Sequence, residues 1–321
     1  MSDTDQDIYR EIFFSSSAIA RDRAVKSGGR FAYYTTSATA HLILKNKELW
    51  MRSTGVMNDF SEVTHGLDCL VRAYNSTPGN DLKKAMEMCI PGVSAEWTDL
   101  FNSLMPTIKH HTYIISVSEH SVDDDLYGRL SMWRAYGGNS GVAFIFNGDP
   151  MFRPSNALKA YSSPVAYLDA DGVGLAMSHI TAALRKHSTY VRQRGKQWLI
   201  EGMSEAFRFS AICTKHPAFS EEREWRVTST QVLHTSERLQ PISEIVGGIT
   251  QLLLKLQLQD APEEGLYGIT LPDFLDRILI GPCEHPDVIA ASLCSLLKSG
   301  GVKNAEDKIH ITGIPLRPNQ R

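Results

Sequence analysis

The strongest structural signal in the sequence lies at residues 112–118, which read TYIISVS. Aromatic and β-branched residues dominate this segment, as they do in buried β-strands. Similar strand patterns occur at 30–35, 49–53, 141–146 and 224–230, and segments with helical spacing of apolar residues separate them. We therefore expect an α+β fold in which helices flank central mixed or antiparallel β-sheets, with 112–118 as a central strand.

Further elements are expected along the rest of the chain from the same periodicities. Helices are predicted at 123–136, 178–213 and 286–298, and strands at 267–271, 277–280 and 309–311. No repeat or long linker marks a domain boundary. We expect an N-terminal extension over 1–29 and a single α+β domain over 30–321, with helical insertions at about 60–108 and 172–213.

Composition limits the classes of function. The formal net charge is −3, with both signs interspersed, so nonspecific binding to a phosphate backbone is not favoured. The five cysteines form no Cys-x-x-Cys pair, which argues against a disulfide framework and a zinc site. The sequence has no stretch apolar enough to cross a membrane and starts without a signal pattern. These features predict a cytoplasmic protein with no membrane contact and no metal.

Two early motifs carry polar side chains that would suit a nucleotide site. Tyr33, Tyr34 and Thr35 could stack on a ring and hydrogen-bond a ribose or phosphate, although a core strand followed by a capped helix explains the same residues. Asn58, Asp59 and Glu62 start a helix and could project into a cleft. A capping box explains that second pattern as well.

Ser116 and Ser118 share one face of the expected central strand because side chains alternate along a strand. Two hydroxyl groups on one face suit the floor of a site, and a strand that merely turns polar at its end is the alternative. Trp133 lies three residues before Tyr136 on the expected helix, so the two rings share a face. Trp133 is a candidate for stacking on a cofactor, with core packing as the alternative.

The charged segment that opens the strand at 224–230 is the most informative motif. Alternation puts Glu222, Glu224 and Arg226 on one face and Arg223 with Trp225 on the other. Two carboxylates on one face repel, so one of them needs a raised pKa or a nearby cation, as in acid–base and ribose-binding sites. An edge strand with surface ion pairs is the alternative reading. Lys215 precedes this segment and is a further cleft candidate.

Six short motifs in order resemble the bacterial family catalogued as domain of unknown function 2971. They are YYTT, NDFSE, the SVS strand, MWRAYG with GVAFIF, KH with EEREWRV, and LIGPCEH. The resemblance covers roughly residues 30 to 317 and implies no activity by itself.

A more distant resemblance is to ADP-ribosyltransferases, which carry an early strand motif, a Ser-containing strand and a Glu-x-Glu strand in this order. It implies a split-sheet core and NAD as the substrate. Tyr33, Tyr34, Thr35, Ser116, Ser118, Trp133 and Arg223 would bind the dinucleotide. Glu224 would be the catalytic carboxylate, with Glu222 orienting or deprotonating the acceptor. The departure from the family is a tyrosine where the first motif usually offers His or Arg.

The expected function is therefore transfer of ADP-ribose from NAD to a protein or nucleic acid, in a toxin or a phage-defence effector. One alternative is a noncatalytic module that senses a nucleotide or binds a partner protein. Another is a metal-dependent nuclease, which would gather Asp59, Glu62, Glu222 and Glu224 around a metal ion.

Overall fold

The structure is a computed structural model that describes residues 3–56, 61–153 and 155–315. The chain divides into two compact units, each assembled from separate segments. Unit 1 comprises Met1–Asp22, Ser53–Thr112 and Ser163–Glu221, and unit 2 comprises Arg23–Arg52, Tyr113–Ser162 and Glu222–Arg321. Both segments that were expected as helical insertions, 60–108 and 172–213, lie in unit 1.

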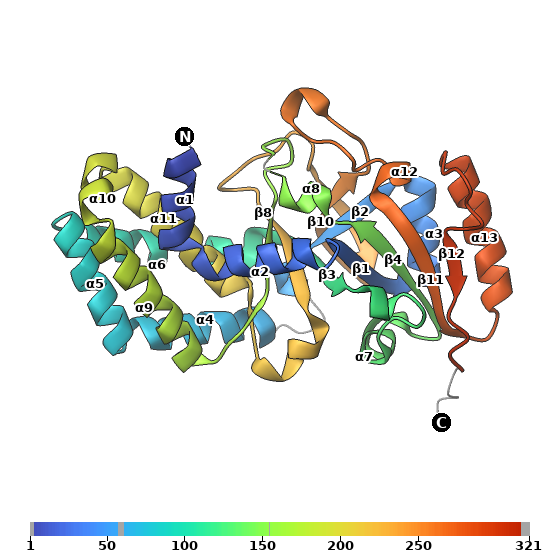
Figure 1. The fold of residues 1–321 in the computed structure, drawn as a ribbon, viewed down its shortest axis with the longest axis horizontal. Helices are drawn as coiled ribbons and strands as arrows, with labels where there is room; N and C mark the ends of the chain where they lie inside the picture. The colour runs from blue at the N-terminus through green and yellow to red at the C-terminus, as the bar shows by residue number, and fades with distance from the viewer. Residues whose placement is uncertain (1–2, 57–60, 154, 316–321) are drawn as a thin grey trace. The chain divides into compact units, whose positions relative to one another are not determined.

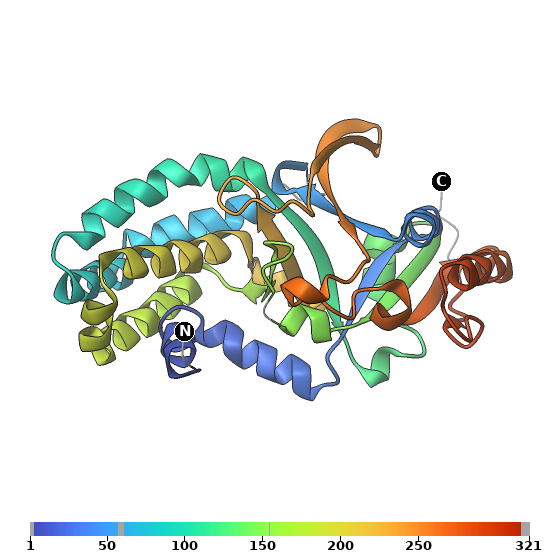
Figure 2. The same cartoon turned by 90° about the horizontal axis from the view of Figure 1, so that it is seen from above.

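Unit 1 is mainly helical. Its helices are α1 (Asp3–Phe13), the start of α2 (Ser15–Lys26), α4 (Ser61–Tyr74), α5 (Thr77–Cys89), α6 (Val93–His111), α9 (Ala170–Lys186), α10 (Ser188–Arg194) and α11 (Lys196–Ile212), with 3-10 turns at Thr54–Val56 and Pro217–Glu222. A short parallel pair joins β6 (Ala166–Tyr167) to β7 (Thr214–Lys215). Helix α11 packs against both α4 and α6, and Figure 2 shows these helices running side by side.

Aromatic rings form the centre of unit 1. The indole of Trp97 lies 4.5 Å from the ring of Phe207 and 5.5 Å from the ring of Tyr74, between ring centroids. Phe101 stacks on Trp97 at 5.4 Å. These residues come from α4, α6 and α11, so burial of their large apolar area holds the three helices together.

Unit 2 is built on a mixed β-sheet. Its strands are β1 (Arg30–Thr36), β2 (Glu48–Ser53), β3 (Thr112–His120), β4 (Ser140–Asn147), β5 (Tyr161–Pro164), β8 (Glu224–Thr230), β9 (Pro241–Val246), β10 (Ile249–Gln257), β11 (Leu275–Cys283) and β12 (Ile309–Ile311). The order is β12-β11-β4-β1-β3-β2-β10-β9, and β8 pairs with β3 and β5. The pair β11–β12 is parallel, whereas β1 is antiparallel to β3 and β4. The expected central strand at 112–118 is confirmed.

The helices of unit 2 are α3 (Ser37–Asn46), α7 (Leu130–Met132), α8 (Asp149–Phe152), α12 (Leu271–Phe274) and α13 (Pro286–Ser299), with a π-helical turn at Trp133–Gly137 and 3-10 turns at Val122–Asp124 and Pro262–Glu264. Helix α3 begins after Thr36, whose side chain caps the amide of Thr39, as expected from the sequence. Helices α3 and α13 pack together beside the sheet, where Figure 1 shows α13 next to β12.

The two faces of the unit 2 sheet bury different clusters. One face carries the main apolar core, which includes Phe31, Val117 and Trp225 and receives α3 and α13. The other face carries a smaller cluster around Tyr34 and Trp133. Alternation along β1, β3 and β8 therefore sends neighbouring residues to opposite faces.

Three of the expected elements differ from the observed ones. The helix predicted over 123–136 is correct only in part: residues 130–137 are helical, but Gly128 adopts a positive φ of 61° and separates them from the 3-10 turn at Val122–Asp124. The segment 178–213 is helical but breaks at His187 and at Gly195, whose φ is 90°. The strand predicted at 267–271 is wrong, since residues 267–270 form no strand and Leu271 begins the short helix α12. No helix among the described residues is long and apolar enough to cross a membrane.

Candidate functional site

Three strands that carry candidate residues are neighbours in the sheet of unit 2. Strand β3 pairs with β1 on one side and with β8. Val117 of β3 and Trp225 of β8 belong to the main core, so Ser116, Ser118, Glu224 and Arg226 point away from it. We call this side of the sheet the motif face. Polar groups from three separate sequence motifs therefore share one face.

The first motif is divided between the two faces. Tyr34 points to the motif face and is buried beside Trp133. Tyr33 packs against the main core on the opposite face, and Thr35, which is also buried, shares that side by alternation. Burial raises the pKa of the Tyr34 hydroxyl. Of the three residues, only Tyr34 lies with the other candidates.

The buried guanidinium of Arg129 occupies the centre of the motif face near Ser118. It donates to the Ser118 hydroxyl, and Ser118 in turn donates to the main-chain oxygen of Glu222. Arg129 also donates to that same oxygen at 3.2 Å, and its backbone N–H donates to the Tyr34 hydroxyl at 3.0 Å. Arg129 thus places a cation beside the first two motifs, although the first motif itself has a tyrosine in place of His or Arg.

Trp133 packs within the smaller cluster. Its side chain is buried, lies 4.8 Å from the Tyr34 ring in an edge-to-face arrangement, and donates from Nε1 to the Tyr127 oxygen at 2.7 Å. A methyl group added at Gly281 would meet its ring at 2.6 Å. The indole therefore fills a space that a glycine leaves open, which matches the core-packing alternative.

The third motif contains a buried ion pair. Arg226 donates to both carboxylate oxygens of Glu224, from Nε at 2.7 Å and from Nη2 at 3.2 Å. Glu224 is 7% exposed and Arg226 is fully buried. Such a two-point contact fixes the plane and position of the carboxylate. Arg226 therefore supplies a cation beside Glu224.

The alternation predicted for Glu222 and Arg223 is wrong. Strand β8 begins at Glu224, and Glu222 ends a 3-10 turn. Arg223, which is exposed, has a positive φ of 45°, and this backbone turn uncouples Glu222 from the strand's two-residue period. Arg223 still contributes its main-chain oxygen, which accepts a hydrogen bond from the Glu119 amide at 2.9 Å.

The remaining candidates lie away from the motif face or outside the described residues. Asn58 and Asp59 fall outside the described residues, and Glu62 lies in α4. Lys215 belongs to unit 1, where it is buried with its Nζ 4.8 Å from the centre of the Phe219 ring. Their roles in a site stay predictions.

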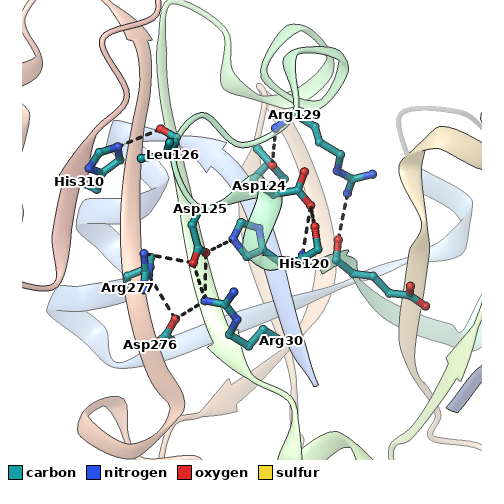
Figure 3. Close-up of polar contacts among 12 residues, drawn as sticks. Arg30, His120, Asp124, Asp125, Leu126, Arg129, Asp276, Arg277 and His310 are labelled. Carbon is teal, nitrogen blue, oxygen red and sulfur yellow. Dashed lines mark hydrogen bonds and ion pairs between the residues drawn. The ribbon is translucent and has the colours of Figure 1, made fainter. Parts of the chain in front are cut away.

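A network of charged residues adjoins the motif face and was not predicted from the sequence (Figure 3). The Asp125 carboxylate lies 3.0 Å from Arg30 Nη1, 2.9 Å from His120 Nε2 and 3.5 Å from Arg277 Nη1. Asp276 accepts from Arg30 at 3.0 Å and from Arg277 at 3.3 Å. The network joins β1, β3 and β11 to the loop that contains Asp125.

This network holds the loop that delivers Arg129. Next to Asp125, the Asp124 carboxylate accepts hydrogen bonds from the Ser121 amide at 3.1 Å and from the Ser121 hydroxyl at 2.9 Å. The main-chain oxygen of Asp124 accepts a hydrogen bond from the Gly128 amide at 2.7 Å. Figure 3 shows Asp124, Asp125 and Arg129 on the same loop. The contacts fix both ends of a short turn, so the position of Arg129 depends on them.

The titrating groups of the network have shifted pKa values. Burial lowers the pKa of His120, although its hydrogen bond to Asp125 opposes this effect. Burial would raise the pKa of Asp125, but hydrogen bonds from Arg30 and His120 outweigh it and lower that pKa. Asp125 is therefore ionised at neutral pH, and the buried ring of His120 is neutral.

Sequence reasoning missed Arg129 and the network for a common reason. Arg30, His120 and Asp276 each stand at or near a strand end, where a charged residue is ordinary. Only the pairing of Arg30 opposite His120 in the β1–β3 ladder brings them together. Among residues 3–56, 61–153 and 155–315, no three His, Cys, Asp or Glu side chains are grouped closely enough to hold a metal ion.

A family model matches part of this chain. No curated protein and no solved structure matches this chain. A family described as "Protein of unknown function (DUF2971)" matches residues 132–227, which begin at the end of α7 and end within β8. The MWRAYG, GVAFIF, KH and EEREWRV motifs lie wholly in this span. The match to residues 132–227 supports the family resemblance drawn from the sequence.

Proposed function

We propose that unit 2 binds NAD on the motif face and transfers its ADP-ribose group to a macromolecular acceptor, in the manner of ADP-ribosyltransferases. The observation that carries this proposal is the adjacency of β1, β3 and β8, with Tyr34, Ser118 and Glu224 on one face. These are the three strands whose motifs resemble those of ADP-ribosyltransferases. Motifs that lie far apart in the sequence gather here.

The proposed roles follow from charge and position. Arg129 and the Tyr34 hydroxyl supply hydrogen-bond donors for the dinucleotide, the Ser118 oxygen offers an acceptor, and the cation suits the pyrophosphate. Glu224, held by Arg226, faces the ribose. Because a fixed carboxylate stabilises developing positive charge without reorganising, Glu224 would lower the barrier to loss of nicotinamide.

The reaction is a substitution at the ribose carbon that bears nicotinamide. The glycosidic bond breaks, its electron pair leaves with nicotinamide, and the ribose passes through an oxocarbenium-like state. A nucleophilic oxygen or nitrogen of the acceptor forms the new bond at the same carbon and loses a proton. Glu222, whose side chain is partly exposed two residues before Glu224, is the proposed group that orients the acceptor or takes this proton.

Nicotinamide release from NAD tests the proposal. Purified wild-type protein with cell lysate as acceptor source is expected to release nicotinamide, and Glu224→Gln is expected to lower the rate by about 100-fold or more. Glu221→Gln is the matched control, because Glu221 is exposed and lies outside the motif face. Circular dichroism verifies folding, and Glu224→Asp, which keeps the charge, gives a second variant. Release that is equal in wild type and Glu224→Gln would contradict the proposal.

A second candidate is a noncatalytic module that binds a nucleotide on the same face. The specific observation in its favour is that Arg226 already contacts both oxygens of the largely buried Glu224, so the carboxylate has a structural use. Calorimetric titration with NAD separates the two functions. Binding without release supports the module, and binding with Glu224-dependent release supports the transferase.

A further inference from the structure

Unit 1 contains a cavity of about 130 Å³, and none of the motif-face residues named above lines it. It is lined by residues near the junction of α1 and α2 and by residues of α4, α9 and α11. All of them belong to unit 1. The cavity therefore forms within one unit.

The walls of the cavity are apolar and aromatic. Phe13, Leu70, Met177 and Phe207 line it and are each at most 5% exposed. The rings of Phe14 and Phe209, which also line it, meet edge to face at 5.9 Å. A ring can pack against aromatic walls of this kind.

Hydroxyl side chains from several segments also line the cavity, among them Ser163, Ser210 and Thr214. Ser15, Ser16 and Ser17 are consecutive lining residues, and they are half-buried or exposed, unlike the apolar walls. The lining contains no Asp, Glu, Lys, Arg or His side chain. A charged ligand would lose its hydration there without gaining a counter-ion. A neutral ligand with one hydrogen-bonding group would avoid this loss.

We propose that this cavity binds a neutral molecule of about one aromatic ring, with the ring between the phenylalanines and its polar substituent toward the three serines. The volume agrees with this size, since an apolar cavity of about 150 Å³ in another protein accommodates benzene. This site is independent of the motif face and does not rest on the function proposed for unit 2.

Fluorine NMR with para-fluorophenol as the probe tests the site on the full-length protein. The signal is expected to broaden and shift on addition of wild-type protein, and benzene is expected to compete. Para-fluorobenzoate, which has similar size but a negative charge, is expected to bind far more weakly. Equal binding of the benzoate would overturn the neutral ligand class, and the lack of any para-fluorophenol binding would overturn the site.

Filling the cavity locates the binding. Ala176→Phe on α9 and Ser210→Leu on α11 both enlarge side chains that line it, and each is expected to weaken para-fluorophenol binding by roughly tenfold or more. Ala182→Phe is the matched control, because Ala182 is an exposed residue of the same helix as Ala176. Thermal unfolding identifies any variant that fails to fold. Unchanged affinity in folded Ala176→Phe and Ser210→Leu would refute the assignment.

Discussion

Substitution of Gly281 by alanine tests the packing on which the motif face depends. An added Cβ at Gly281 would lie 2.6 Å, 2.7 Å and 2.8 Å from three ring carbons of Trp133. The ring is buried against Tyr34, so it has little room to move. Overpacking of this kind typically costs about 1–3 kcal/mol. We expect Gly281→Ala to lower the free energy of unfolding by an amount in that range.

Gly137→Ala is the matched control, because its Cβ would lie 3.5 Å from the same indole ring, an ordinary contact. Urea denaturation followed by circular dichroism measures both variants, and the control is expected to change stability by less than about 0.5 kcal/mol. In the double variant Gly281→Ala/Trp133→Phe, the smaller ring should relieve part of the overpacking. The double variant should therefore lose less free energy of unfolding than the sum of the losses in the two single variants. Equal stability of Gly281→Ala and wild type would refute the location of the indole.

Two further predictions concern the charged groups of unit 2. Because burial lowers the pKa of His120 below its ordinary 6.5, the unfolded chain takes up a proton before the folded one does as pH falls. The free energy of unfolding should then decrease below about pH 6.5, by up to about 1.4 kcal/mol per pH unit, and urea denaturation of His120→Gln should show a shallower decrease. A slope identical to that of wild type would contradict a buried neutral His120. For the buried Glu224–Arg226 pair, Arg226→Met alone should cost about 3–5 kcal/mol, while Glu224→Leu/Arg226→Met should cost markedly less. A double-mutant cycle measures this coupling, and additive costs would show that the pair is not coupled.

The strands of unit 2 were predictable because their local patterns agree with their final environment. Residues 112–118 and 141–146 are rich in β-branched and aromatic residues and form buried strands. The hairpin of β9 and β10 was missed because its outer strand is largely exposed, so its sequence lacks the apolar alternation of a half-buried strand. Local pattern therefore identified buried elements better than exposed ones.

The candidate site was only partly predictable. Alternation correctly put Ser116 with Ser118 and Glu224 with Arg226, because each pair lies within one continuous strand. It failed for Glu222, since Arg223 adopts a positive φ that interrupts the alternation and that the sequence pattern does not reveal. Arg129 was missed because it reaches Ser118 from a turn that is fixed by long-range ion pairs.

Transfer of label from NAD to a macromolecule tests the central claim most directly. Wild-type protein, Glu224→Gln and Glu221→Gln are each incubated with lysate and NAD labelled in its adenylate phosphate, and acid-insoluble label is counted after protease or nuclease treatment. The proposed function predicts incorporation by wild type and Glu221→Gln and loss of incorporation in Glu224→Gln. Loss of the label on protease treatment would identify a protein acceptor, and loss on nuclease treatment would identify a nucleic acid. Incorporation by none of the folded proteins, together with no NAD binding, would contradict it.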